Sequence, residues 1–251
     1  MNLWHAVAIF AAGVGAGGIN AVVGSGSLIT FPTLVALGYP PIVANVSNNI
    51  GLVPGSAAST YGYRKELKGQ RERLLRLGSA SLLGSLLGGI LLISLPAQAF
   101  KVIVPVLIVV ALVLVVVQPR LNAWVMARRE IQHSHGGPWL WLGVFAAGVY
   151  GGYFGAAQGI ILMALLSIFL DDKLQRINGA KNALSGIVNG TAAVLFVFIA
   201  PVNWLVVLLI ALGSTLGGLL GASVGRKLPP LVLRGVIVVV GVTAIAKLLF
   251  G

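Results

Sequence analysis

The sequence predicts an all-α, polytopic integral membrane protein, made of two inverted repeats of about five membrane segments each, with short broken or re-entrant helices. Of its 251 residues, 58% are hydrophobic and only 9% are charged, and the mean hydropathy is +1.00. Soluble domains carry about 25% charged residues, so an ordinary soluble enzyme is excluded. The chain has no cysteine, which also excludes disulfides and thiolate sites.

The repeat is visible as matched residues at a nearly constant spacing. The segment Phe10–Val14 returns as Phe145–Val149, an offset of 135 residues, and after a two-residue gap the offset becomes 133, as for Asn45 and Asn178. Because apolar matches are common in such a chain, the matched asparagine, glycine and proline residues carry the argument. We expect three regions: a first transmembrane repeat at 1–118, a polar linker at 119–138, and a second transmembrane repeat at 139–251.

The apolar runs place the membrane segments in order. A transmembrane helix needs about 20 apolar residues. The first half predicts helices near 3–22, 42–61, 74–95 and 98–117, with a shorter segment at 25–37. The second half predicts segments near 139–155, 157–170, 178–200, 203–225 and 231–250. The segments at 25–37 and 157–170 are too short to span comfortably, so they are either re-entrant half-helices or tilted short spans.

The charges of equivalent loops differ between the halves. The loop 62–76 carries six basic residues, whereas its counterpart at 200–203 carries none. Conversely, the turns at 38–41 and 94–99 are uncharged, whereas their counterparts hold the charges of 171–176 and of Arg226 and Lys227. Since Lys and Arg favour cytoplasmic loops, equivalent loops are predicted on opposite sides of the membrane. Five segments per half then place both termini outside.

Two glycine-rich breaks are candidates for a binding site, because transporters with inverted repeats bind substrates where matching helices are interrupted. The first break is Gly24-Ser25-Gly26-Ser27, and the second, at 155–159, contains Gln158 and Gly159. If a helix follows each break, its N-terminal N–H groups and positive dipole end favour an anion. Ser25, Ser27 and Gln158 can add side-chain donors. The alternative is that the glycines only allow close helix packing.

A second set of candidates is polar and opens two equivalent helices: Asn45, Asn48 and Asn49 in the first half, and Asn178, Lys181 and Asn182 in the second. Asn45 and Asn49 lie four residues apart and therefore share one helix face. Buried carboxamides are costly without partners, which suggests ligand contact, although Asn45 and Asn178 could equally be N-caps. Lys181 either supplies a positive charge for an anionic substrate or extends to the membrane interface.

The positions of the acidic residues and histidines limit the classes of substrate and of reaction that the sequence supports. All five acids are expected in loops, and cation carriers and proton relays usually need a carboxylate within a span. An anionic substrate therefore fits better than a metal cation, and we expect no metal site and no cofactor. A serine nucleophile would need an adjacent base, but no histidine lies in a later span, so we expect no enzyme. The basic loops predict membrane topology and contact with anionic lipids rather than nucleic-acid binding.

With these motifs in place, the chain resembles the sulfite exporter TauE/SafE family of membrane transporters. The resemblance rests on the glycine-rich start, Gly13 to Gly26, on Ser27-Leu28-Ile29-Thr30-Phe31-Pro32-Thr33-Leu34, and on Ala44-Asn45, with an echo at Gly148 to Gly159. The chain departs from the family in having Ser25 and Ser27 where glycines are denser, and Met163-Ala164-Leu165 where proline is typical.

The resemblance implies transport of small sulfur-containing oxyanions such as sulfite and sulfonates. We expect a multi-pass protein of the inner (plasma) membrane that works by alternating access. A passive anion channel and a membrane scaffold without substrate are the alternatives, and the oligomeric state cannot be read from the sequence.

Overall fold

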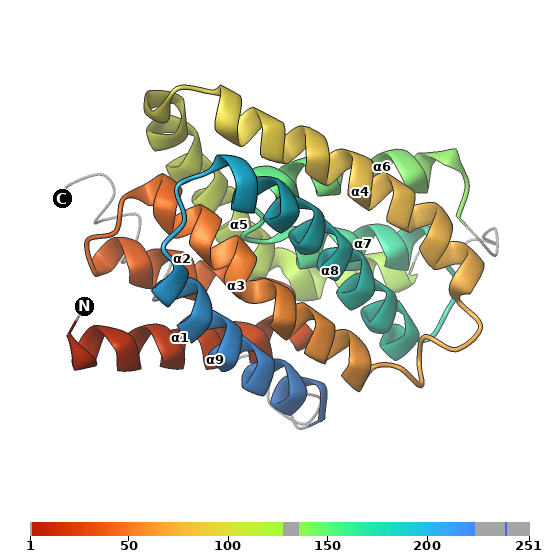
Figure 1. Cartoon of the computed structure of the whole chain (residues 1–251). Coiled ribbons are helices and arrows are strands. Elements are labelled where there is room, and N and C mark those ends of the chain that lie inside the picture. Colours follow the sequence, from red (N-terminus) through yellow and green to blue (C-terminus); the bar gives the residue numbers. More distant parts are fainter. Residues whose placement is uncertain (1, 128–135, 224–238, 240–251) are drawn as a thin grey trace.

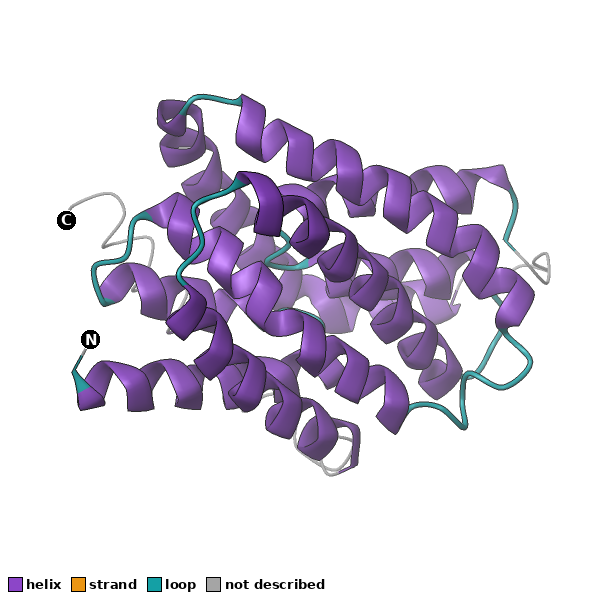
Figure 2. Ribbon diagram, in the orientation of Figure 1, coloured by secondary structure: helices purple, strands orange, loops and turns teal. Residues whose placement is uncertain are grey.

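The computed structural model describes residues 2–127, 136–223 and 239 (Figure 1). Within these residues the chain forms helices and loops and contains no strand (Figure 2), which confirms the predicted all-α class. In chain order the helices are α1 (Leu3–Val22), α2 (Ser27–Ala36), α3 (Pro41–Gly62), α4 (Arg71–Ser94), α5 (Ala97–Ala127), α6 (Pro138–Tyr153), α7 (Gln158–Phe169), α8 (Leu174–Ile199) and α9 (Trp204–Ser223).

Most helix boundaries fall within a few residues of the prediction, with two informative differences. Helix α5 continues to Ala127, ten residues beyond the predicted end at 117, so the first part of the expected polar linker is helical. Helix α8 begins at Leu174 rather than at 178, which places Asn178 in its second turn. The predicted helix at 231–250, together with Arg226 and Lys227, lies outside the described residues.

Five of the described helices are long and apolar enough to cross a membrane: α1, α4, the 98–117 part of α5, α8 and α9. Their outward faces carry large apolar side chains, such as Ile90 on α4, Phe198 on α8 and Leu220 on α9, which are 50%, 82% and 56% exposed. Such surfaces are stable against lipid rather than water. Helix α3 has 22 residues but is too polar to be among the five.

The two halves pack through each other's helices. Helix α1 lies along α9, and α6, its counterpart in the second half, lies along α4 (Figure 1). The backbones approach closely: a Cβ on Gly217 would be 2.0 Å from the Val14 oxygen, and one on Gly84 would be 2.2 Å from the Phe145 oxygen. Small residues allow such close contact between membrane helices. The glycines of α1 and α6 also serve packing, since a Cβ on Gly17 would be 2.2 Å from the Ser214 oxygen and one on Gly152 would be 2.3 Å from the Ser85 oxygen.

Equivalent helices run in opposite directions at the centre of the molecule. Ser56 on α3 lies beside Asn189 on α8, whereas Tyr63, near the end of α3, lies beside Gly179, near the start of α8. Helices α2 and α7 start beside each other and lead to loops at opposite ends of the molecule (Figure 1). At 10 and 12 residues, they are about 15 and 18 Å long, against about 30 Å for the hydrocarbon core.

Candidate functional site

Both helix breaks are built by the same local turn. The N–H groups of Val23 and Gly24 both donate to the Ile19 oxygen at the end of α1, and those of Phe154 and Gly155 both donate to the Tyr150 oxygen at the end of α6. Gly24 and Gly155 have φ values of +89° and +73°. Glycine adopts this left-handed conformation without steric cost, so it ends the helix and turns the chain sharply.

The two breaks touch each other. The N–H of Gly159 donates to the Gly24 oxygen over 3.0 Å, and a Cβ on Gly159 would lie 2.4 Å from the Gly24 Cα. The second break is anchored by its neighbour Phe154, whose ring packs edge-on against that of Phe31 in α2, with centroids 5.1 Å apart. Segments about 135 residues apart in sequence therefore meet as a backbone-to-backbone contact that only glycine permits.

A small polar cavity lies beside this contact. The centre of a water molecule can occupy about 20 Å³ of it, which on this measure is room for about one water molecule. Its walls come from both breaks and from α1, α3 and α8, and every lining residue is a glycine or carries a hydroxyl or a carboxamide. They are Asn20, Gly24, Ser27, Ser56, Ser59, Gly155, Gln158, Gly159, Asn182, Ser185 and Asn189.

The predicted site residues divide into two groups. Gly24, Ser27, Gln158, Gly159 and Asn182 line the cavity, so the structure brings both breaks and one of the asparagine positions together. The others do not line it, and all of them are buried or glycine: Ser25, Gly26, Asn45, Asn48, Asn49, Asn178 and Lys181. Ser25 Oγ and Asn49 Oδ1 have no hydrogen-bond partner among the described residues.

Several cavity groups can donate hydrogen bonds. Within the described part of the chain, Gln158 Nε2 and Ser185 Oγ are buried without a partner. The hydroxyl oxygens of Ser27 and Ser56 accept from Asn48 and Asn189, each over 3.2 Å. A hydroxyl that accepts can still donate its own proton. Because a buried donor without a partner costs about 1–3 kcal/mol, these groups favour an acceptor-rich occupant.

The main-chain N–H groups at the breaks were expected to be free to bind an anion, but they already donate to other groups of the protein. The Gly26 N–H, just before α2, donates to Asn20 Oδ1 over 2.6 Å, and the Gly159 N–H at the start of α7 donates to the Gly24 oxygen. The prediction that the helix N-termini offer these N–H groups to an anion is therefore wrong for this conformation. Their partners, Asn20 and Gly24, line the cavity themselves.

Asn45 and Asn178 are not N-caps, because α3 and α8 begin four residues earlier, with Pro40 and Lys173 at the capping positions. Instead, each of them binds a carbonyl at the end of the other half's first helix. Asn45 Nδ2 donates to the Tyr153 oxygen of α6 over 3.0 Å. Asn178 Nδ2 donates to the Ala21 oxygen of α1 over 3.1 Å.

Two further residues of α8 bind the end of α1. Asn182 Nδ2 also donates to the Ala21 oxygen, over 3.1 Å, and Lys181 Nζ donates to the Asn20 oxygen over 2.8 Å. These carbonyls are the unsatisfied negative end of the α1 dipole. Asn48, the counterpart of Lys181, contacts α2 instead, through Ser27 and a short hydrogen bond with Thr30.

Lys181 is 1% exposed, so the expectation that it extends to the membrane interface is wrong. It lies directly behind Asn20, whose side chain lines the cavity. Among the described acids, Glu66, Asp171 and Asp172 lie in loops, and Glu72 lies exposed in the first turn of α4 rather than in a loop as expected. No described carboxylate pairs with Lys181, whose Nζ instead donates to the Asn20 oxygen behind the cavity.

Sequence reasoning placed Gly155 in the second break but missed Asn20, Ser56, Ser59, Ser185 and Asn189 as cavity residues. A helical pattern could have found some of them, since Asn178, Asn182, Ser185 and Asn189 fall at positions i, i+4, i+7 and i+11 of one face of α8. Ser56 and Asn189 are also related by the offset of 133, and they form a hydrogen bond. Asn20 has no such pattern in the sequence.

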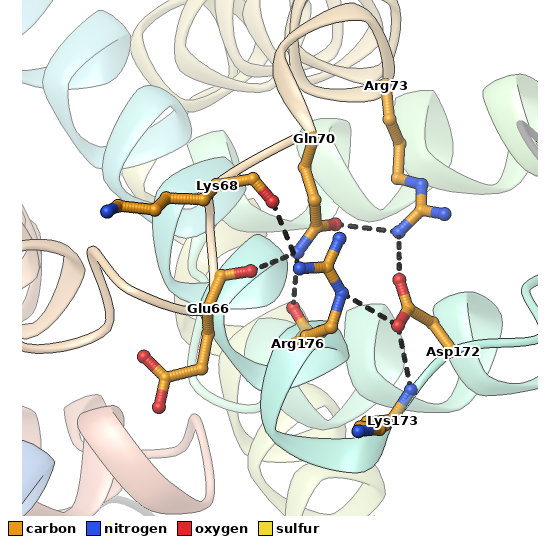
Figure 3. A network of polar contacts seen from close by, with 7 residues as sticks. All are labelled: Glu66, Lys68, Gln70, Arg73, Asp172, Lys173 and Arg176. Carbon is orange, nitrogen blue, oxygen red and sulfur yellow. Dashed lines mark hydrogen bonds and ion pairs between the residues drawn. The ribbon is translucent and has the colours of Figure 1, made fainter.

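A polar network joins the two halves at the end of the molecule that carries residues 62–76 and 171–176, here called the basic end (Figure 3). The predicted loop 62–76 is shorter than expected, because α4 already begins at Arg71. Asp172 Oδ2 pairs with Arg73 over 2.8 Å, and Asp172 Oδ1 pairs with Arg176 over 2.8 Å. Gln70 accepts from Arg73 and donates to the Arg176 oxygen. Burial alone would raise the pKa of Asp172, but the hydrogen bonds from Arg73 and the Lys173 N–H, with the charge of Arg176, lower that pKa below its usual value.

A bundle of lipid-facing helices that encloses a small polar cavity between two helix breaks has the architecture of a polytopic membrane transporter. Comparison with known proteins agrees. The profile of the family described as "Sulfite exporter TauE/SafE" matches residues 9–248. The chain belongs to this family, and it is an integral membrane protein.

Curated relatives support the same class. The chain is 27% identical over 240 residues to the probable membrane transporter protein YfcA of Escherichia coli K12, which covers 94% of this chain and 86% of that protein. It is 28% identical over 246 residues to a probable membrane transporter protein of Haemophilus influenzae, covering 96% and 93%. The probable membrane transporter protein ORF9 of Sinorhizobium sp is 25% identical over 243 residues, covering 96% and 91%. No solved structure matches the chain significantly.

Proposed function

We propose that this transporter carries a small sulfur-containing oxyanion, such as sulfite or a sulfonate, through the cavity between the two helix breaks. The observation that carries the proposal is the burial of Lys181 behind the cavity without a carboxylate partner among the described residues. An isolated charge is expensive in a low-dielectric interior, and an anion in the cavity would offset that cost. The sulfur chemistry itself comes from the family.

The proposed binding groups are hydrogen-bond donors rather than the helix N-termini alone. Gln158 Nε2, Ser185 Oγ and the hydroxyls of Ser27 and Ser56 would bind the oxyanion. Asn182, which also lines the cavity, would bind it only if it released the Ala21 oxygen. A sulfur oxyanion offers several acceptor oxygens and therefore suits a cavity whose unpaired groups are donors.

The proposed mechanism is alternating access by two inverted repeats, 1–118 and 139–251, with residues 119–138 between them. Two observations support it. Helices α3 and α8 run in opposite directions, and in each of the pairs α1–α9 and α4–α6 a helix of one half packs against a helix of the other half. A cavity with room for about one water molecule is closed to an ion of this size, as expected for one state of such a cycle. Rocking of the halves would open it to one side at a time.

The charge distribution supports placing the basic end in the cytoplasm and the protein in the inner (plasma) membrane. The segments 62–76 and 171–176 meet at that end, whereas the connections α2–α3, α4–α5 and α8–α9 lie at the other (Figure 1). Lys and Arg are retained on the cytoplasmic side during insertion. On this orientation the described N-terminal start of α1 faces outside.

The test is flux of radiolabelled sulfite into proteoliposomes that contain the purified chain, compared with sulfate and acetate. We expect saturable sulfite flux in the wild type. In Lys181→Met, removal of one charge-assisted interaction worth about 1.5–3 kcal/mol should lower kcat/KM by about 10- to 150-fold. Gln158→Leu should lower it by about 5-fold, from the loss of one neutral hydrogen bond of about 1 kcal/mol.

Matched control variants test whether a loss of flux is specific to the cavity or follows from any loss of a charge or a carboxamide. Lys173→Met removes one positive charge at the exposed start of the same helix, and Gln98→Leu removes one carboxamide from the exposed face of α5. Both should keep wild-type flux. Equal losses in Lys173→Met and Lys181→Met, or no saturable flux of any sulfur oxyanion by the folded wild type, would refute the proposal. Non-saturating conductance would instead identify a channel.

A further inference from the structure

A second feature of the chain is an open groove on its lipid-facing surface at the basic end. The groove has a volume of about 810 Å³ and lies between α3, α4 and α8. Its walls are largely apolar and include Val53, Ala57, Leu74, Leu75 and Ile187. Leu75 is 66% exposed, so this surface is open to the surroundings of the protein rather than part of the core.

Two arginines, Arg64 and Arg71, form the polar rim of the groove. Arg64 donates to the Tyr61 oxygen over 3.1 Å, and its guanidinium carbon lies 4.3 Å from the centroid of the Tyr61 ring. Both arginines are exposed, and within the described part of the chain neither forms an ion pair. By contrast, Arg73 of the same loop region is paired with Asp172.

The combination of an apolar trough and an unpaired cationic rim selects an amphipathic anion. Guanidinium groups bind phosphate oxygens through two parallel hydrogen bonds, and the trough offers a surface for an acyl chain. Tyr61, which is 61% exposed beside Arg64, has the amphipathic ring that favours the membrane–water interface. Basic residues at this depth are attracted to anionic lipids.

We propose that this groove is a binding site for one anionic phospholipid, with its phosphate on Arg64 and Arg71 and one acyl chain along α3, α4 and α8. A free phosphate would bind the two arginines but would not contact the apolar walls of the groove. A zwitterionic lipid would contact the apolar walls but would carry no net negative charge for the arginines. Ala57 and Gly186 of the groove directly follow Ser56 and Ser185, which line the cavity. The lipid would therefore contact α3 and α8, two of the helices that line the cavity.

The test is retention of lipid by the purified, full-length protein in detergent, measured by native mass spectrometry. The probes are phosphatidylglycerol and phosphatidylcholine with identical acyl chains, and glycerol 3-phosphate as the headgroup without chains. We expect phosphatidylglycerol to bind more tightly than phosphatidylcholine by about 30-fold, since each of two basic residues contributes at an anionic lipid surface. Glycerol 3-phosphate should not be retained under the same conditions.

Three variants test whether the arginines and the apolar walls of the groove bind the lipid. Arg64→Gln/Arg71→Gln should reduce phosphatidylglycerol retention to the phosphatidylcholine level. Lys68→Gln/Arg76→Gln removes the same charge from exposed positions outside the groove and should retain the lipid. Ala57→Trp fills the exposed trough with both arginines intact and should lower retention of both lipids.

The circular dichroism of each variant should match the wild type, which separates lost binding from lost folding. Equal retention of the two lipids by the wild type would overturn the proposal, as would equal losses in the two charge-removing pairs. It would also be overturned if Ala57→Trp disrupted a dimer, because a second copy of the chain would then occupy the groove.

Discussion

Replacing Gly159 by alanine should separate the two helix breaks. The new Cβ would lie 2.4 Å from the Gly24 Cα and 2.8 Å from its carbonyl oxygen. Non-bonded carbons pack at about 3.5–4.0 Å, so the two backbones must move apart by about 1 Å. That movement would lengthen the hydrogen bond from the Gly159 N–H to the Gly24 oxygen, now 3.0 Å, to about 4 Å, beyond useful hydrogen-bond range.

The expected loss of stability follows from these two effects. Overpacking a close contact costs about 1–3 kcal/mol, and the broken hydrogen bond costs about 0.5–1.5 kcal/mol, so Gly159→Ala should lower the free energy of unfolding by about 2–4 kcal/mol. The control is Gly190→Ala, because a Cβ at this position in α8 meets no other atom within 4 Å. That variant should gain about 0.5–1 kcal/mol from its higher helix propensity.

The assay is equilibrium unfolding in mixed micelles of mild detergent and sodium dodecyl sulfate, followed by helicity. The free-energy difference between the two variants is then expected to be about 2.5–5 kcal/mol, in favour of Gly190→Ala. A Gly159→Ala protein that unfolds within about 0.5 kcal/mol of the wild type, inside the range of ordinary surface changes, would show that the contact between the breaks does not hold the centre of the molecule together.

Three further predictions concern the contacts between the halves. Tyr63→Phe removes the hydroxyl that accepts from Asn178 over 2.8 Å, and should cost about 1 kcal/mol in the same unfolding assay. Ser85→Ala removes the 2.7 Å hydrogen bond from α4 to the Val188 oxygen of α8 and should cost about 0.5–1.5 kcal/mol. For the network at the basic end, the lowered pKa of Asp172 means that its ionised form stabilises the fold above the ordinary pKa of about 3.9. The stabilisation is lost as the pH falls through the lower folded-state pKa. The melting temperature should therefore show no Asp172 contribution to its pH dependence between pH 5 and 8, but should drop below about pH 4. In Asp172→Asn that acid drop should be smaller, and an equal drop would contradict this role.

Among the described residues, the sequence was sufficient for the approximate positions of most helices and of the breaks between them. Long apolar runs determine where the spans lie, and the glycines of the two breaks mark where α1 and α6 end. It was less informative at α5, where the polar residues after 117 suggested a linker although the helix continues to Ala127. A run of apolar residues locates the part of a helix that lies in the membrane, but it does not show how far the helix extends beyond the membrane.

The roles of the asparagines and of Lys181 could not be predicted, because their partners are carbonyls of the other half. Asn45 and Asn178 reach residues 108 and 157 positions away in the chain. Periodicity places such residues on a helix face but does not reveal which distant helix end lies opposite. The N-cap interpretation failed for a local reason as well, since α3 begins at Pro41 and α8 at Leu174, which places both asparagines in the second turn of their helices.

The polarity of α3 affects how the protein inserts into the membrane during its synthesis. This helix buries Asn45, Ser47, Asn48 and Ser59, and their partners include Tyr153 of α6 and Asn203 just before α9, which are synthesised much later. On its own such a segment partitions poorly into lipid. We therefore expect α3 to become stable in the membrane only after the second half has been synthesised. A ribosome that stalls after the first half would leave an unfinished protein that the membrane does not readily accept.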